Sequence, residues 1–189
     1  MKKIIFFIIL YVMIFGVIVA DEPPLPMTEF TSQNNEYKLI LVETIREANN
    51  LTQKWKLVRI DTNEVLYDFI YPQFALSGLK VLISDDGNNI VLIDWFLWVD
   101  WNNEDTQTIM NKNIVKFYYM GEETRRYKLS ALFNSIENGI KSVSHLQWTR
   151  DNRNYIIMEN DQVKIRTLES IEYVFNIRTG DIESRLEYR

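Results

Sequence analysis

The chain has 189 residues, a net charge of −5, one histidine and no cysteine. The acidic balance removes the electrostatic reason to bind nucleic acid. Without cysteine there is no disulfide, and a single histidine leaves too few ligands for a transition-metal site. We therefore expect no nucleic-acid partner, no metal and no cofactor.

Residues 1–20 have the order of a secretory signal peptide. Lys2 and Lys3 precede the apolar run Ile4–Val19, and the small residue Ala20 follows. The alternative is an uncleaved N-terminal anchor, for which the run is slightly shorter than the ~20 residues of a spanning helix. We expect an exported protein of a bacterial envelope, periplasmic or extracellular. Membrane contact is expected only through this segment, if it is uncleaved.

The predicted organisation after this segment is simple. The prolines from Pro23 to Pro26 predict an extended leader over residues 21–36. Residues 37–189 are long enough for a single β-rich domain with its own core. Its first predicted strand is Tyr37–Val42, and the polar stretch Glu47–Gln53, which has no periodicity, is typical of a loop.

Two predicted hairpins follow in chain order. The first joins Trp55–Asp61 to Val65–Tyr71. The second joins Leu79–Ser84 to Asn89–Trp95 through the turn Asp85–Asn88, where Gly87 favours a tight reversal. Both arms of the second hairpin are apolar on both faces, which predicts a place in the middle of the domain.

The next stretch contains the one predicted helix. Phe96–Ile109 is a long polar loop apart from its aromatic residues, and Ile114–Tyr119 is another strand. Apolar residues at helical spacing predict a helix from Leu129 to Ile140, with Ser130 as its N-cap and Gly139 at its end.

The last third of the chain returns to strands. Two further hairpins are predicted, and their arms are Tyr155–Glu159 with Gln162–Leu168 and Tyr173–Asn176 with Ile182–Glu187. The fold class expected from all these elements is all-β: consecutive antiparallel hairpins in a partial β-propeller-like stack or a sandwich, with one short helix.

Several turns resemble those of known proteins. An apolar strand followed by Ser84–Gly87 and a strand ending at Asp94-Trp95 resembles the WD40-like β-propeller repeats of exported bacterial proteins, as do the turns Asp61–Glu64 and Arg178–Asp181. The order Trp55–Arg59, Ser84–Gly87, Asp94-Trp95 and Leu129–Phe133 also resembles a group of uncharacterised exported bacterial proteins. The resemblance implies repeated hairpins and brings no known activity. The motif spacing is irregular, and the predicted strands would make fewer than three four-stranded blades.

Catalytic and metal-binding patterns give no assignment. The sequence contains no nucleophile elbow that could supply a partner for His145, and no second histidine at a metal-binding spacing. Asp85, Asp86 and Asn88 do not follow a calcium-loop spacing, and turn chemistry alone explains them. We therefore assign no catalytic residue and no metal ligand.

The candidate ligand-binding residues lie in one tryptophan-rich loop. Indole faces beside carboxylates and amides suit a sugar ring, and aromatic clusters also suit a protein partner. The alternative is that these large side chains are part of the core. The candidates are Trp95, Trp98, Asp100, Trp101, Asn102, Glu104 and Asp105.

These observations favour a non-enzymatic binding or structural module of the cell envelope, with a protein or a glycan as its partner. The alternative is an envelope glycoside hydrolase, which needs two carboxylates ~5–10 Å apart near the loop. Asp94, Asp100, Glu104 and Asp105 are the acids available for such a pair. A purely architectural protein without a ligand is a third reading.

Overall fold

The computed structural model describes residues 28–188 except residues 48–49, 73–77 and 153. The predicted signal peptide or anchor therefore lies outside the described residues. Among the helices of the described part, none combines the length and the apolar character needed to cross a membrane.

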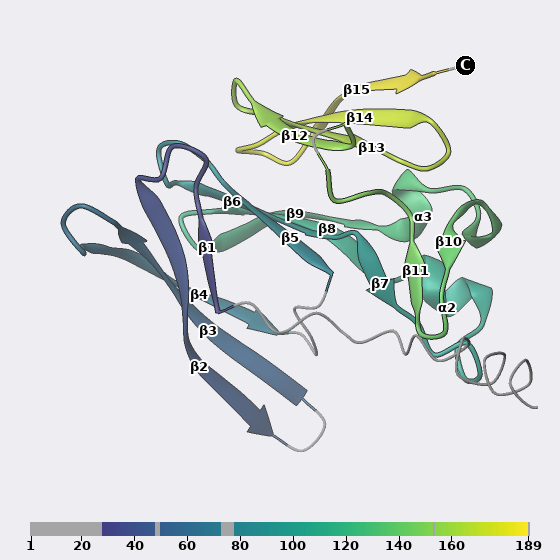
Figure 1. Cartoon of the computed structure of the whole chain (residues 1–189), viewed down its shortest axis with the longest axis horizontal. Helices are drawn as coiled ribbons and strands as arrows, with labels where there is room; N and C mark the ends of the chain where they lie inside the picture. The colour runs from purple at the N-terminus through teal and green to yellow at the C-terminus, as the bar shows by residue number, and fades with distance from the viewer. Residues whose placement is uncertain (1–27, 48–49, 73–77, 153, 189) are drawn as a thin grey trace, which may run out of the picture.

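The protein is all-β, and its described residues form four antiparallel sheets (Figure 1). Three of these sheets have four strands each, and we call them the first, second and third sheets in chain order. The first contains β1 (Glu29–Thr31), β2 (Tyr37–Glu47), β3 (Asn50–Arg59) and β4 (Val65–Pro72). The second contains β5 (Leu79–Ile83), β6 (Asn89–Asp94), β8 (Asn113–Tyr119) and β9 (Glu122–Lys128). The third contains β12 (Ile156–Glu159), β13 (Gln162–Arg166), β14 (Ile171–Asn176) and β15 (Ile182–Glu187).

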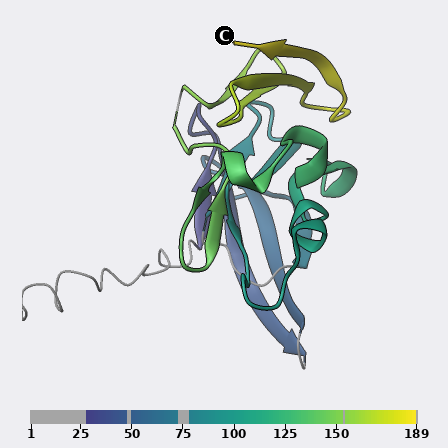
Figure 2. The same cartoon turned by 90° about the vertical axis from the view of Figure 1, so that its right-hand side faces the viewer.

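The remaining elements lie between these sheets in the chain. The small sheet has the order β10 (Ile140–Lys141), β11 (His145–Gln147) and β7 (Phe96–Trp98). The helical elements are α2 (Thr106–Met110), α3 (Leu129–Leu132) and the 3₁₀ helix η1 (Ile136–Asn138). Figure 2 shows the molecule from the side, with the third sheet lying across one end of the other sheets.

The three four-stranded sheets repeat one backbone contact. In each sheet, the N–H of the residue just after the third strand donates to the carbonyl of the residue just before the second strand. The pairs are Ile60 to Glu36 at 2.8 Å, Met120 to Asn88 at 2.8 Å and Ile177 to Asp161 at 2.9 Å. The chain therefore builds the same four-stranded meander three times.

Two of the turns are also alike in their side chains. Ser84 Oγ accepts a hydrogen bond from the Asn89 N–H at 2.9 Å and donates to Asp86 Oδ1 at 2.5 Å. In the first sheet, Ser32 Oγ accepts from the Tyr37 N–H at 3.0 Å in the same way. The tight turn predicted around Gly87 is thus present, and an equivalent turn precedes β2.

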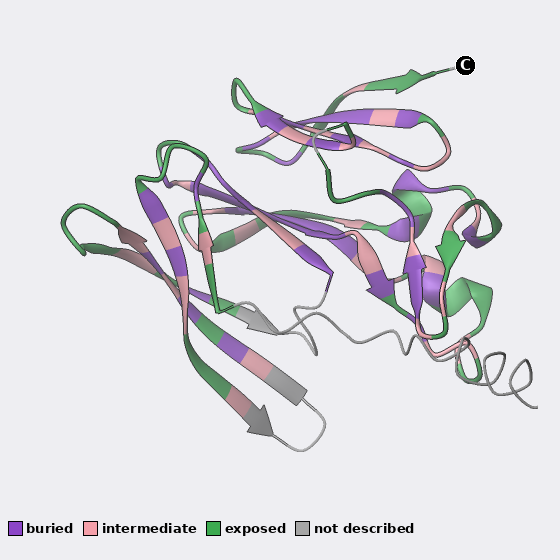
Figure 3. Cartoon of the chain, viewed as in Figure 1, coloured by how far each residue is buried: buried purple, intermediate pink, exposed green. Residues whose placement is uncertain are grey.

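The second sheet lies in the middle and carries core on both faces. Ile90 and Leu92 of β6 pack with the first sheet, whereas Val91 and Ile93 pack with the third and small sheets. All four side chains are at most 3% exposed. The prediction that this hairpin is buried on both faces is confirmed for β6, which is buried along its whole length (Figure 3), whereas Lys80 and Val81 of β5 are only partly buried.

A tyrosine and a glycine join each pair of neighbouring sheets. Tyr67 of β4 donates its hydroxyl proton to the Gly87 carbonyl at 2.8 Å, and Tyr127 of β9 donates to the Gly180 carbonyl at 2.8 Å. A Cβ on Gly87 would lie 2.7 Å from the Tyr37 ring, and one on Gly180 would lie 2.9 Å from Phe117. Both turns therefore need glycine for close packing as well as for backbone conformation.

Some expectations about elements were wrong because strands extend through polar sequence. The loop predicted over Glu47–Gln53 contains the end of β2 and the start of β3. The leader predicted over residues 21–36 contains β1, which pairs with β2. Polar residues are compatible with strands here because cross-strand backbone pairing and one solvated face are enough to hold them.

The helix prediction was also partly wrong. The segment predicted as one helix from Leu129 to Ile140 contains α3 and, after a break, the 3₁₀ helix η1. Ser135 rather than Ser130 is a cap, because its side chain accepts from the Glu137 N–H, while Gly139 does end η1. The apolar spacing reflects one buried side of two short turns, with Leu129, Leu132 and Ile136 all buried.

Candidate functional site

The tryptophan-rich segment begins with β7, which pairs with β11 in the small sheet. His145 lies opposite Trp98, and Leu146 lies opposite Leu97. Because neighbouring residues of a strand face opposite sides, Leu97 points into the core at 4% exposure and Trp98 points outward at 53%. Val99 is buried again at 1%. The long loop predicted over Phe96–Ile109 is therefore partly a strand, and it ends in α2.

Trp98 is held in place by the side chain of Lys112. The Lys112 ammonium lies 5.3 Å from the centroid of the Trp98 ring and donates to the Trp98 carbonyl at 2.7 Å. Glu104 pairs with the same ammonium at 2.7 Å. Two predicted site residues, Trp98 and Glu104, are thus brought together by a lysine that the sequence pattern did not single out.

The other two tryptophans of the segment have structural contacts. Trp95 and Trp101 are partly buried and pack against the main core. The Trp101 indole N–H donates to the Ser142 carbonyl at 2.9 Å, and the Lys141 ammonium lies 5.6 Å from its ring centroid. The segment therefore presents one well-exposed indole rather than three.

An aromatic stack supports the strand beside Trp98. The Phe96 and His145 rings are stacked with centroids 4.3 Å apart and planes at 6°. His145 is only 4% exposed, and its Nδ1 lies 2.9 Å from Ser144 Oγ. Since Phe96 and Trp98 share one face of β7, this stack fixes the surface from which Trp98 projects.

The acids of the segment support local structure. Asp100 accepts from the Asn102 N–H at 3.2 Å and from the Asn103 amide at 2.8 Å, and the Asn103 bond holds the Asp100 pKa below its ordinary value. Asp105 caps α2 through the Thr108 N–H at 2.7 Å, which lowers its pKa as well. Asn102 itself is exposed at the tip of the turn. Neither acid has the raised pKa that a general acid needs.

Asp94 is the last residue of β6 and belongs to the second sheet. It is 8% exposed, and its carbonyl accepts the Trp148 indole N–H at 2.6 Å. Among the described residues, no group of three or more His, Asp or Glu side chains is placed to hold a metal ion.

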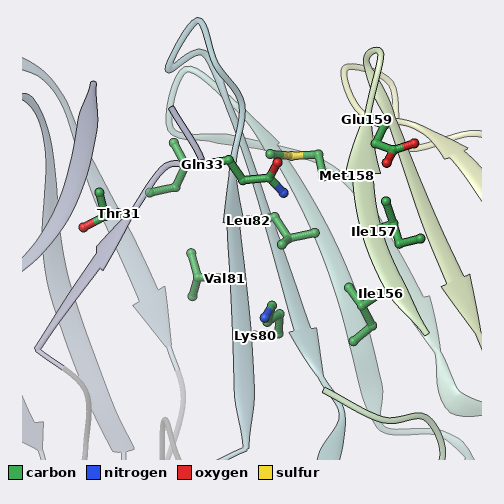
Figure 4. Close-up of a pocket in the computed structure, with 10 residues that line it drawn as sticks. Thr31, Gln33, Lys80, Val81, Leu82, Ile156, Ile157, Met158 and Glu159 are labelled. Atoms are coloured by element: carbon green, nitrogen blue, oxygen red, sulfur yellow. The ribbon is translucent and has the colours of Figure 1, made fainter. Parts of the chain in front are cut away.

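A hollow lies apart from the tryptophan-rich segment, where the first strands of the three larger sheets come together. Its volume is about 570 Å³, within the range of small-molecule sites. It is lined by Thr31 and Gln33 from the β1 side, by Lys80–Ile83 of β5 and by Ile156–Glu159 of β12 (Figure 4). The sequence gives no sign of this hollow, because these three segments are far apart in the chain and none carries a local motif.

Comparison with known proteins identifies no relative by sequence. No model of a known protein family matches the chain, and no curated protein matches it either. Among solved structures, the chain is similar to the computationally designed Ika8 protein, with 13% identity and a TM-score of 0.33. The similarity covers 79% of this chain and 37% of that one, so this chain spans well under two thirds of its length.

Proposed function

We propose that the protein is a non-enzymatic binding module of the cell envelope that engages its ligand through Trp98. The observation that carries this proposal is the exposure of an indole that is at the same time fixed by a neighbouring cation. Large aromatic side chains normally bury their faces, and a rigid exposed one loses little conformational entropy when it binds.

A glycan is the ligand that we put first. Trp98 offers an apolar face for the C–H surface of a sugar, and Lys112 and Glu104 beside it offer hydrogen bonds to hydroxyl groups. A protein partner is the second ligand, because Ile140 of β10 and Val143 in the turn between β10 and β11 are exposed at 48% and 87%.

Hydrolysis of the glycan is the less favoured function. The acids nearest Trp98 already accept hydrogen bonds or an ion pair: Glu104 from Lys112, Asp100 from Asn103 and Asp105 from Thr108. A hydrolase needs one carboxyl that stays protonated, and the hydrogen bonds to Asp100 and Asp105 act in the opposite direction.

We also propose that the protein is exported and that its three sheets correspond to blades of the WD40-like kind. Support for the second statement comes from the backbone contact that all three sheets share and from the serine turns before β2 and β6. Four antiparallel strands per unit is the composition of a propeller blade.

Calorimetric titration with soluble glycan chains of bacterial cell wall tests the function. We expect binding by the unmodified protein and a loss of about tenfold or more in affinity for Trp98→Ala. The matched control is Ile70→Ala, which removes a 59%-exposed side chain from β4.

Two outcomes would contradict the proposal. Equal affinity of Trp98→Ala and Ile70→Ala would show that Trp98 is not the binding surface. Release of new reducing ends from the glycan, abolished by Asp100→Asn, would show an enzyme instead of a binding module.

A further inference from the structure

The cavity between the larger sheets is lined by strand edges rather than by strand faces. Four consecutive residues of β5 and four of β12 line it. Because neighbouring side chains of a strand point to opposite faces, a surface that touches all of them in turn must run along the edge. β1, β5 and β12 are the outermost strands of their sheets on this side.

The register shows which backbone groups of β5 point into the cavity. The Ser84 N–H donates to the Asn89 carbonyl, and the Trp95 N–H donates to the Gly78 carbonyl. Hydrogen-bonded and non-hydrogen-bonded pairs alternate in an antiparallel ladder. The backbone N–H and C=O groups of Lys80 and Leu82 therefore bond to β6. The N–H and C=O groups of Val81 and Ile83 are therefore directed to the open edge.

The opposite wall has the same pattern. The Arg166 N–H donates to the Tyr155 carbonyl at 2.7 Å. By the same alternation, the backbone groups of Ile157 bond to β13, and the N–H and C=O of Met158 point to the open edge of β12. Two strand edges with repeating donors and acceptors thus border one hollow. Between them lie the apolar side chains of Leu82 and Met158 (Figure 4).

Charge is balanced at the end of the cavity where Lys80 lies. The Lys80 ammonium pairs with Asp151, which precedes β12, at 2.7 Å. Glu159, the other charged residue that lines the cavity, pairs with Lys164 at 4.0 Å. The cavity therefore offers repeated backbone hydrogen bonds and apolar walls, and both of its charged side chains already have a partner of opposite charge.

We propose that this cavity binds an extended, uncharged peptide segment of a partner protein, which adds to β5 as a further strand. A peptide backbone repeats its donors and acceptors every second residue, as β5 does, whereas a sugar or a lipid does not. Side chains at alternate positions of the peptide contact Leu82 and Met158. This site is separate from the Trp98 surface.

The test uses the full chain and the peptide acetyl-Thr-Val-Thr-Val-Thr-Val-amide as the probe. Hydrogen–deuterium exchange followed by NMR should show slower exchange of the Val81 and Ile83 amides when the probe is added. The Glu187 amide, on the open edge of β15, should not change. An analogue with every amide N-methylated should not bind and should give no protection, because it cannot donate to the Val81 and Ile83 carbonyls and its methyl groups block the approach to the β5 edge.

Val81→Pro gives a second test, because it removes an N–H that is not used in the β5–β6 ladder. We expect the affinity for the probe to fall about fivefold, as for the loss of one backbone hydrogen bond. The control Glu187→Pro, on β15, should bind as the unmodified protein does.

Equal binding by Val81→Pro, protection by the N-methylated analogue, or unchanged exchange at Val81 and Ile83 up to the solubility of the probe would each overturn the proposal. If Val81→Pro does not fold, the exchange experiment on the unmodified protein decides alone. Protection of the same amides by a glycan but not by the peptide would also overturn it.

Discussion

Two serines that face no solvent hold equivalent turns closed. Ser32 and Ser84 are 3% and 6% exposed, and each Oγ satisfies a backbone N–H five residues later. Removing either hydroxyl leaves that donor unpaired in a buried place. Such a loss costs about 1–3 kcal/mol.

We therefore predict that Ser32→Ala and Ser84→Ala each lower the free energy of unfolding by about 1–3 kcal/mol in urea denaturation. Ser130→Ala, at an exposed position on α3, should change it little. If the two turn variants were as stable as Ser130→Ala, the hydrogen bonds of Ser32 and Ser84 would not be important for stability.

Asp86 in the second of these turns predicts a dependence on pH. Burial raises its pKa, but the hydrogen bonds from Ser84 and Asn88 lower it more, so the folded-state pKa lies below the ordinary value. A carboxyl with a lowered pKa stabilises the fold above its unfolded pKa of about 3.9, and this contribution is lost as the pH falls through the folded value.

The free energy of unfolding should accordingly decrease between about pH 5 and pH 2, and less steeply in Asp86→Asn. Urea denaturation at several pH values measures both slopes. Ser130→Ala, which changes no titratable group, is the control and should keep the slope of the unmodified protein. An identical slope in Asp86→Asn would contradict the assignment.

At this scale the sequence predicted the turn and not the exposure of the tryptophans. Asp-Asp-Gly-Asn is local turn chemistry, so the Ser84–Asn89 reversal could be predicted. Which of Trp95, Trp98 and Trp101 faces solvent depends on the pairing of β7 with β11, whose strands are separated by much of the second sheet. Lys112 joins the site through the same non-local packing.

At the scale of elements, Gly87 and Gly180 lie where neighbouring sheets contact each other. Their φ angles are +73° in both cases, and an added Cβ would meet Tyr37 or the Arg125 and Phe117 side chains. Gly87→Ala and Gly180→Ala should each destabilise the protein by more than about 1 kcal/mol, because both strain and overpacking act against alanine.

Thermal unfolding measures this effect. The control Thr179→Ala changes an exposed neighbour of Gly180 without a clash. If Gly180→Ala melted at the same temperature as Thr179→Ala, position 180 would tolerate a Cβ and the close contact there would not be important for stability.

Elements with strong local patterns were predictable, and elements defined by pairing were not. The hairpins around Gly87, Asn160 and Gly180 have apolar arms and turn residues, and all three are present. β9 has the polar sequence of residues 122–128 and exists because it pairs with β8. The helix α2 is too short for a periodic signal.

At the scale of the whole molecule, the second sheet links the first sheet to the third and small sheets. Its two faces belong to two hydrophobic clusters, one with the first sheet and one with the third and small sheets. Loss of either neighbour would expose the buried side chains of β6 and β8. We therefore expect the sheets to unfold together rather than one after another.

Trp55 and Trp148 allow this to be measured, because they lie in different clusters and are 2% and 0% exposed. One variant keeps Trp55, a second keeps Trp148 and a third keeps both, and phenylalanine replaces the remaining tryptophans. The fluorescence of Trp55 and the fluorescence of Trp148 should report the same urea midpoint. In the variant that carries both tryptophans, fluorescence and circular dichroism can be compared. Two separate urea midpoints there would mean that the first sheet unfolds as an independent unit.

The threefold repetition was not predicted in full from the sequence. The sequence predicts the Ser84–Gly87 and Arg178–Asp181 turns but not the polar strands β1 and β9, so the predicted strands are too few for three four-stranded units. The segment with α3, η1 and part of the small sheet separates the second and third sheets and makes the motif spacing irregular. The repeat becomes visible in the backbone contact that the three sheets share.

The most direct test of the proposed function is tryptophan fluorescence with acrylamide as the quencher, comparing the unmodified protein with Trp98→Phe. We predict that Trp98→Phe removes most of the quenchable, red-shifted emission, because Trp98 is 53% exposed while Trp55 and Trp148 are buried. Cell-wall glycan should shift and protect this emission in the unmodified protein alone. Equal quenching of both proteins, or a glycan response that survives in Trp98→Phe, would contradict the proposal that Trp98 is the binding surface.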